Sequence, residues 1–269
     1  MSWGLEHVSV DVDRAPALID VDATVAPGEV LAIVGGDGAG KTTLARTLVG
    51  LLRAKTGVVR RPESTRIGYL PATSGVWPDL TVTENLAFVA DVHRMSRQDR
   101  ASRVHHLLAV TELTAAADRL GADLSGGMRR KLGFAMALLA EPDLIVLDEP
   151  STGVDPVSRA DLWALMTAAA VGGAAVVFTT TYLDEAERAR SICALEAGRV
   201  LASGTLGDIA ASVRGEIVDR RSDGSRSWRR GRQWRTWRPD GSIPDGSARI
   251  DADLTDLLVA ASLAAEEAM

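Results

Sequence analysis

The sequence predicts an α/β fold: a mainly parallel sheet with an antiparallel β edge, an inserted helical subdomain and a small C-terminal appendage. Unbroken apolar runs such as 30–34 and 144–147 alternate with helix-like segments, as is typical of parallel strands covered on both faces. The first thirty residues instead alternate apolar and polar side chains, which indicates half-buried antiparallel strands. From residue 81 to about 140 the apolar spacing is helical, which predicts the inserted block.

The individual elements follow from the same patterns. Before residue 72 we expect two antiparallel strands, a buried strand, a helix from the glycine-rich loop to about Gly57, and a short strand; the strands span 8–12, 19–25, 30–34 and 66–71. The helical block begins at Thr81, where a hydroxyl precedes Glu84 by three positions. Beyond it we expect strands and helices at 144–147, 156–170, 176–178 and 182–190, and then a hairpin of 192–195 and 199–202.

The pattern changes beyond residue 213, where Asp-Gly pairs at 223, 240 and 245 indicate turns. A final helix is expected over 254–265. We therefore expect residues 1–212 to form one domain with the helical subdomain inserted at about 73–140. Residues 213–269 are expected to form the appendage of short strands and one helix.

Composition restricts the classes of protein that the chain can represent. The chain has 269 residues with 46% apolar residues, so a substantial core is expected. No apolar run is long enough to cross a bilayer, and the N-terminus does not resemble a secretory signal. The single cysteine, Cys193, is expected to be a buried strand residue in a reduced, cytosolic protein. The net charge of −6 argues against whole-chain attraction to nucleic acid.

A glycine-rich loop directly follows the apolar run 30–34 and precedes a helix, which is the setting of a phosphate-binding loop. Glycines let backbone N–H groups close around a triphosphate. Lys41 adds a positive charge for the β- and γ-phosphates, and the Thr42 hydroxyl can bind Mg²⁺. The candidate nucleotide-binding residues are Gly35, Gly36, Asp37, Gly38, Ala39, Gly40, Lys41, Thr42 and Thr43.

Two acids, Asp148 and Glu149, close the apolar strand 144–147. At the C-terminal end of a parallel strand, Asp148 can reach Mg²⁺ directly or through water. Glu149 is then placed to orient and deprotonate an attacking water, so it is the candidate catalytic residue. The metal candidates are Thr42 and Asp148.

A third string, LSGGMRRK at 124–131, precedes this strand by about twenty residues. Ser125 can cap a helix whose first turn contains only Gly126 and Gly127. The N–H groups of such a helix start form an anion site.

Together, the strings GGDGAGKTT, LSGGMRRK, LIVLDEP and STGVD resemble the nucleotide-binding domain of an ABC transporter over residues 3–212. Three finer strings, WPDLTVTENL, VDPVSR and YLDEAE, resemble ABC-2 type drug-exporter ATPases of the daunorubicin-resistance and tandem-ATPase groups. The resemblance implies that ATP and Mg²⁺ are bound and that two such domains clamp ATP head to tail. Ser125, Gly126 and Gly127 would then serve the nucleotide of the partner domain, and Asp155 and Thr181 are further candidate nucleotide contacts.

The chain departs from this family at several positions near the γ-phosphate. Ala72 and Thr181 stand where the family usually has Gln and His, and Asp37 stands where it has Asn or Ser. Val12 stands where an aromatic residue stacks on adenine. A carboxylate about 4 Å from a phosphate charge costs roughly 1 kcal/mol in water and about 4 kcal/mol at a dielectric constant of 20. We therefore expect slow or no turnover on this chain's own phosphate-binding loop, although Thr181 with a water remains an alternative to the histidine.

The resemblance predicts an ATP-binding subunit of a multisubunit ABC exporter at the cytoplasmic face of the membrane. Its expected partners are a second, competent ABC ATPase domain and ABC-2 type transmembrane subunits, with no nucleic acid. The alternatives are a soluble ABC ATPase that acts on ribosomes or DNA, and a binding-only regulatory subunit.

Residues 214–238 are rich in arginine and tryptophan, which predicts hairpins with packed Trp and solvated Arg side chains. Lipid headgroups and nucleic acid are alternative partners of this segment. The arginines are Arg214, Arg220, Arg221, Arg226, Arg229, Arg230, Arg232, Arg235 and Arg238.

Overall fold

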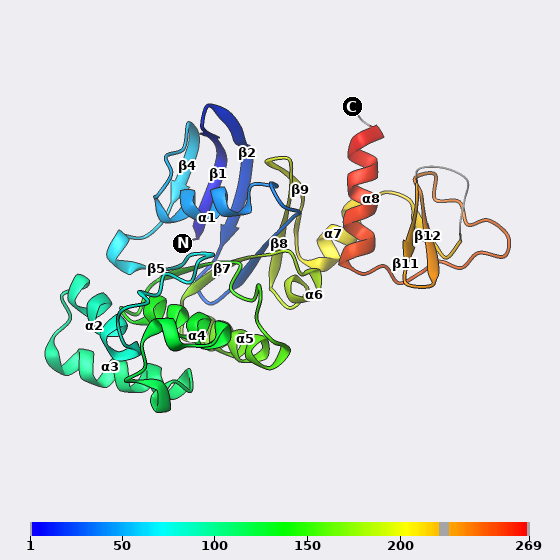
Figure 1. The fold of residues 1–269 in the computed structure, drawn as a ribbon. Helices are drawn as coiled ribbons and strands as arrows, with labels where there is room; N and C mark the ends of the chain where they lie inside the picture. Colours follow the sequence, from blue (N-terminus) through cyan, green and yellow to red (C-terminus); the bar gives the residue numbers. More distant parts are fainter. Residues whose placement is uncertain (1, 221–225, 268–269) are drawn as a thin grey trace.

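A central six-stranded sheet organises the computed structural model, which describes residues 2–220 and 226–267. Its strand order is β5-β6-β7-β3-β8-β9, and every pairing is parallel except β8 with β9. Figure 1 shows this sheet at the centre of the domain, with helices beneath it. The strands are β3 (Val30–Val34), β5 (Ile67–Leu70), β6 (Leu144–Asp148), β7 (Ala175–Thr180), β8 (Ser191–Glu196) and β9 (Arg199–Gly204).

A separate antiparallel sheet with the order β2-β1-β4 lies above one face of the central sheet (Figure 1). Its strands are β1 (Trp3–Val12), β2 (Ala15–Val25) and β4 (Thr56–Arg60). Helix α1 (Lys41–Val49) belongs to the same core, where Leu44 packs with Val21 and Ile33. The helix ends earlier than the expected Gly57, because Gly50 at φ 84° caps it and sends the chain toward β4.

The other face of the central sheet is covered by α4 (Gly126–Leu138) and α5 (Pro156–Val171). Successive residues of each strand point to opposite faces, so Ile33 joins the core with α1 whereas Ala32 joins the core with Phe134 and Leu162. The short helix α6 (Leu183–Ala186) follows β7 and is shorter than the expected 182–190.

The helical block consists of α2 (Val82–Val92) and α3 (Arg97–Val110), linked to α4 by the 3₁₀ turns η2 (Thr114–Ala116) and η3 (Gly121–Asp123). A further 3₁₀ turn, η1 (Ser64–Arg66), precedes β5. Thr81 and Glu84 form the expected capping box at the start of α2. Leu86 and Leu107 pack against Leu132 of α4, and Phe134 of the same helix packs in the main core. Helix α4 therefore packs both against the block and against the sheet.

The C-terminal segment forms a small sheet, β10-β12-β11, packed on one helix, α8. Leu254 and Leu257 of α8 belong to the main core, whereas Ala260 packs with Ile217 and Trp237 of the small sheet. Figure 1 shows α8 between the small sheet and the rest of the molecule. The elements are α7 (Leu206–Ser212), β10 (Glu216–Val218), β11 (Ser227–Arg230), β12 (Gln233–Arg238) and α8 (Leu254–Glu267).

The α/β fold predicted from the sequence is confirmed. Arg221 and the Asp223-Gly224 turn signal lie outside the described residues. Within the described part, none of the helices combines the length and apolarity that a membrane span requires.

Candidate functional site

The glycine-rich loop runs from the end of β3 into the first turn of α1 and leaves that turn without a side-chain cap. Its backbone N–H groups are thus available to an anion, as at other helix N-termini. Gly40 precedes the helix at φ 106°, and an added Cβ there would lie 2.8 Å from the Leu18 side chain and 2.9 Å from the Ala17 carbonyl oxygen. Only glycine fits this position without strain.

Lys41 is the cation of this loop and is only 5% exposed. Its Nζ donates to the carbonyl oxygens of Gly35 at 2.8 Å and Gly36 at 3.0 Å. The same atom lies 3.6 Å from Oε1 of Glu149. The lysine, the loop carbonyls and the candidate catalytic acid therefore converge, although Thr42 of α1 and Asp148 at the end of β6 are 106 positions apart in the sequence.

Asp148 is fully buried, and only one of its two carboxylate oxygens accepts hydrogen bonds from the described residues. Oδ1 accepts from the hydroxyls of Thr42 at 3.2 Å and Thr179 at 2.7 Å. Oδ2 is buried and has no hydrogen-bond partner among the described residues. A buried oxygen left free costs about 1–3 kcal/mol, so its position next to a hydroxyl in the phosphate loop fits a divalent cation such as Mg²⁺.

Glu149 adopts a left-handed backbone conformation, at φ 49°, immediately after the strand. Its backbone N–H donates to the Thr179 hydroxyl at 2.8 Å. Its Oε2 accepts from the Thr152 hydroxyl at 3.2 Å. This carboxylate is only partly buried, so it borders the space in front of the phosphate loop.

The glycines of the LSGG string lie beside the loop that follows Glu149. Ser125 caps α4 as expected, because its Oγ accepts from the N–H of Met128 at 3.2 Å. An added Cβ at Gly126 would lie 3.9 Å from the Gly153 carbonyl oxygen, and one at Gly127 would lie 2.8 Å from Ser158 Oγ. Gly127 thus packs closely on the start of α5.

Asp155 caps that start of α5, where its Oδ1 accepts from the N–H groups of Val157 and Ser158 at 3.0 Å each. Hydrogen bonds from the Ser158 side chain and backbone lower the pKa of Asp155 below its ordinary value. The carboxylate therefore carries a charge at neutral pH next to Gly127.

The positions that depart from the family pattern are placed as follows. Thr181 directly follows β7 and is exposed. Ala72 lines a cavity of about 410 Å³ together with Gly126, Arg130 and Thr152. Asp37 is exposed at the tip of the loop, and Val12 ends β1.

Sequence reasoning missed three residues of this region: Thr179, Thr180 and Glu185. Thr179 fixes Asp148 and the backbone of Glu149, and the pairing of Asp148 with Thr179 across β6 and β7 places it there. The run of three threonines at 179–181 was the available signal.

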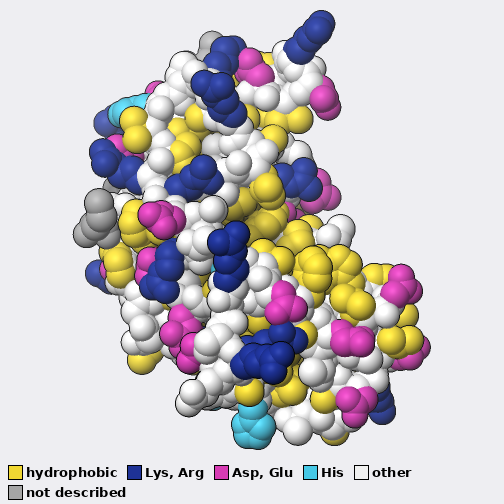
Figure 2. Space-filling model, turned by 90° about the vertical axis from the view of Figure 1, so that its left-hand side faces the viewer, with side chains coloured by type: hydrophobic (Ala, Val, Ile, Leu, Met, Phe, Trp, Pro, Cys, Tyr) yellow, Lys and Arg dark blue, Asp and Glu magenta, His cyan; other side chains and the backbone are white. Residues whose placement is uncertain are grey.

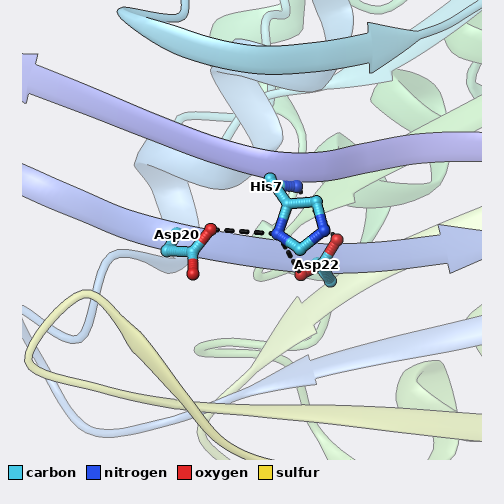
Figure 3. Close-up of side chains that lie close together, drawn as sticks. All are labelled: His7, Asp20 and Asp22. Atoms are coloured by element: carbon cyan, nitrogen blue, oxygen red, sulfur yellow. Dashed lines mark hydrogen bonds and ion pairs between the residues drawn. The ribbon is translucent and has the colours of Figure 1, made fainter.

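A separate polar group lies on the antiparallel sheet, as Figure 3 shows. The His7 Nδ1 lies 3.1 Å from Asp20 Oδ1 and 3.4 Å from Asp22 Oδ2. Among residues 2–220 and 226–267, these three exposed residues are the group whose side-chain ligand atoms lie close enough together to hold a metal ion.

Cys193 lies in β8 and is 1% exposed, as expected of a buried strand residue. Burial raises the pKa of its thiol to about 12, so the thiol stays protonated.

Several arginines and tryptophans of the described part of 214–238 contact other parts of the appendage. Trp228 Nε1 donates to Asp256 Oδ1 at 3.0 Å, and Trp237 is buried with Nε1 on the Arg214 carbonyl oxygen at 2.8 Å. Arg226 and Arg230 form ion pairs with acids of the α8 segment. Trp228 and Trp237 are thus hydrogen-bonded within the appendage, and Arg226 and Arg230 form ion pairs there.

Comparison with known proteins identifies the family. Residues 18–152 match the family model described as ABC transporter. The chain is 39% identical over 211 residues to the "Probable multidrug ABC transporter ATP-binding protein YbhF" of Escherichia coli strain K12, which covers 75% of this chain and 36% of that protein. It is 37% identical over 214 residues to the "Daunorubicin resistance ATP-binding protein DrrA3" of Streptomyces coeruleorubidus, which covers 76% of this chain and 68% of that protein.

A solved structure described as "Structure of ATP binding subunit of ABC transporter" superimposes with a TM-score of 0.72 at 31% identity, covering 78% of this chain and 92% of the other. The chain spans only about a third of the length of the Escherichia coli relative. The family match, the two relatives and this solved structure show that the chain belongs to the ABC transporter family, as an ATP-binding domain.

Proposed function

We propose that the chain is the ATP-binding subunit of a multisubunit ABC exporter and that it holds Mg·ATP on residues 35–43. The convergence of Lys41, Thr42 and the unpartnered Asp148 oxygen carries this proposal. The names of the two relatives, a probable multidrug transporter protein and a daunorubicin-resistance protein, support the exporter assignment. Bound Mg²⁺ would offset the negative charge of the phosphates.

In this proposal Lys41 binds the β- and γ-phosphates, and the uncapped first turn of α1 donates its N–H groups to them. Thr42 and Asp148 hold the metal. Glu149 accepts the proton of an attacking water, and Thr179 keeps its backbone in place. Asp155 and Thr181 complete the set of candidate nucleotide contacts.

We further propose that hydrolysis on this chain's own loop is slow or absent. Thr181 is exposed and its side chain is shorter than the family's histidine, and Ala72 has no polar atom to offer. Asp37 adds a like charge beside the γ-phosphate position. The acid Glu149 is present, but the groups that would assist it are missing.

The LSGG string has the features needed to serve a second, competent ABC ATPase domain. Ser125 caps α4, and Gly126 and Gly127 leave its first turn free of bulky side chains. An added Cβ at Gly126 or Gly127 would lie near Gly153 or Ser158, whereas Lys41 donates to the Gly35 carbonyl oxygen of its own loop. We therefore propose an asymmetric heterodimer in which this string completes the partner's site.

ABC-2 type transmembrane subunits are the proposed membrane partners, which would place the chain at the cytoplasmic face of the membrane as a peripheral subunit. Trp77, Phe88 and Val92 expose apolar side chains on the helical block, and the rings of Trp77 and Phe88 lie 4.5 Å apart. Figure 2 views the molecule from this side and shows hydrophobic side chains with both acidic and basic ones around them. Such a surface suits a partner segment with apolar residues.

Two measurements test the proposal. Equilibrium binding should show Mg·ATP retained by the purified chain, and turnover should be near background without the partner ATPase and brisk with it. Brisk turnover by the chain alone that Glu149→Gln abolishes would contradict the degenerate site. No turnover in the complex would favour the binding-only regulatory subunit, and co-purification with ribosomes or DNA instead of membrane subunits would favour the non-transport ATPase.

A further inference from the structure

A buried glutamate, Glu185, joins the two loops that border the nucleotide site. Its side chain is 3% exposed and lies on the short helix α6. Oε2 accepts from the Ser151 hydroxyl at 2.7 Å and from the Thr180 hydroxyl at 3.0 Å. Ser151 begins the loop 151–155, and Thr180 is the last residue of β7.

The remaining charge of this carboxylate faces an arginine. Arg159 Nε on α5 lies 3.3 Å from Glu185 Oε1, and its guanidinium stacks on the Tyr182 ring at 4.4 Å from the ring centre. Tyr182 also donates its backbone N–H to the Thr180 hydroxyl at 3.0 Å. These contacts link residues 180–182 to α5. Removing one partner would leave a buried charge uncompensated, which destabilises the folded protein.

Both loops reach residues that border the nucleotide. In the loop 151–155, Thr152 donates to the Glu149 carboxylate and Asp155 caps α5 beside Gly127. On the other side, Thr180 immediately precedes Thr181. The carboxylate of Glu185 accepts a hydrogen bond from one hydroxyl of each segment, that of Ser151 and that of Thr180.

We propose that Glu185 is a positioning residue that couples the loop 151–155 to residues 180–182, so that a displacement at Thr181 is transmitted to Thr152, Glu149 and Asp155. The proposal rests on Mg·ATP binding at residues 35–43. Glu185 itself touches no phosphate-loop residue in the contacts of the described chain. Its removal should therefore change communication between the loops and leave nucleotide affinity unchanged.

The experiment is amide hydrogen exchange on the full chain with Mg·ATP and with Mg·ADP. In the parent protein, Mg·ATP should slow amide exchange at 35–43. At 152–155, exchange should be roughly fivefold or more slower with Mg·ATP than with Mg·ADP, a factor at the lower end of typical couplings between two sites. In Glu185→Gln the protection at 35–43 should remain and the difference at 152–155 should disappear. The matched control is Asp184→Asn, which removes an exposed acid from the same short helix and should behave like the parent.

A second pair of variants keeps the test valid where Glu185→Gln fails to fold. Thr180→Ser retains the hydroxyl and should retain the coupling, whereas Thr180→Val has the same shape without the hydroxyl and should lose it. The proposal is overturned where Glu185→Gln or Thr180→Val shows the parent's difference at 152–155, or where the parent shows none. Absence of protection at 35–43 in the parent would instead overturn the proposed nucleotide site.

Discussion

The ammonium group of Lys41 lies 3.6 Å from the Glu149 carboxylate while it donates to two backbone carbonyl oxygens of its own loop. Both side chains are largely shielded from water, at 5% and 24% exposure. The positive charge of the phosphate loop and the candidate base are thus already at contact distance. A nucleotide on this loop would share Lys41 between its phosphates and Glu149.

Replacing Lys41 should remove most of the affinity for nucleotide. Hydrogen bonds to a charged group contribute about 1.5–3 kcal/mol, so Lys41→Met is expected to weaken Mg·ATP binding by roughly 10- to 150-fold. The check is calorimetric titration. Lys55→Met is the control, since Lys55 pairs with Asp11 on the surface and should bind ATP like the parent. Equal affinities for the two variants would contradict the assigned role.

Neutralising Asp148 should abolish the metal dependence of ATP binding. Asn can still accept from the Thr42 and Thr179 hydroxyls, but it offers no anionic oxygen to a cation. In Asp148→Asn, added Mg²⁺ should no longer improve ATP affinity, while the metal-free affinity stays close to that of the parent. Asp143→Asn, an exposed acid paired with Arg66, is the control. A variant that retained the full effect of Mg²⁺ would exclude Asp148 as the ligand.

Restoring the histidine at position 181 should raise turnover on the chain's own loop. A single well-placed donor to the developing charge is worth on the order of 100-fold in rate. Thr181→His is therefore expected to increase ATP hydrolysis by the purified chain at least several-fold, and the gain should vanish in Thr181→His combined with Glu149→Gln. Thr181→Asn, which cannot carry a proton charge, serves for comparison. Unchanged turnover in Thr181→His would mean that another feature limits the site.

The His7 group should make part of the folding stability depend on pH. The hydrogen bond to Asp20, followed by the charge of Asp22, raises the pKa of His7 above its ordinary value. The folded chain therefore binds this proton more tightly than the unfolded chain. The resulting stability is fully present below the unfolded pKa, about 6.5, and is lost as the pH rises through the folded value.

Proton NMR of the His7 ring checks this directly. Asp20→Asn should move the titration toward lower pH, and Asp13→Asn, which changes an exposed acid outside this group, should not. If neither substitution moved the His7 titration, the Asp20 carboxylate would be ruled out as the cause of the raised pKa.

The sequence predicted those parts of the site that local chemistry determines. The phosphate loop needs glycines at fixed offsets from one strand and one helix, and Asp148 ends a strand whose apolar run is unmistakable. Thr179 and Glu185 were not predicted, because their roles depend on the pairing of β6 with β7 and on the burial of α6.

The predicted end of α1 and the missed strand β4 were wrong for related reasons. Leu51 continues the helical spacing of α1, but it is 64% exposed and lies beyond the Gly50 cap, so spacing alone extended the helix too far. Strand β4 was missed, because its residues are mostly exposed and its order comes from pairing with β1 some fifty residues earlier.

The two-sided packing of α8 has a consequence for how the chain is made. The small sheet leaves the ribosome before the helix on which Trp237 rests, and that helix must also seat Leu254 in a core built from much earlier residues. The face of the small sheet that packs on α8 therefore stays uncovered until both α8 and the completed domain are available. Chaperone contact during synthesis is thus expected to concentrate on this stretch.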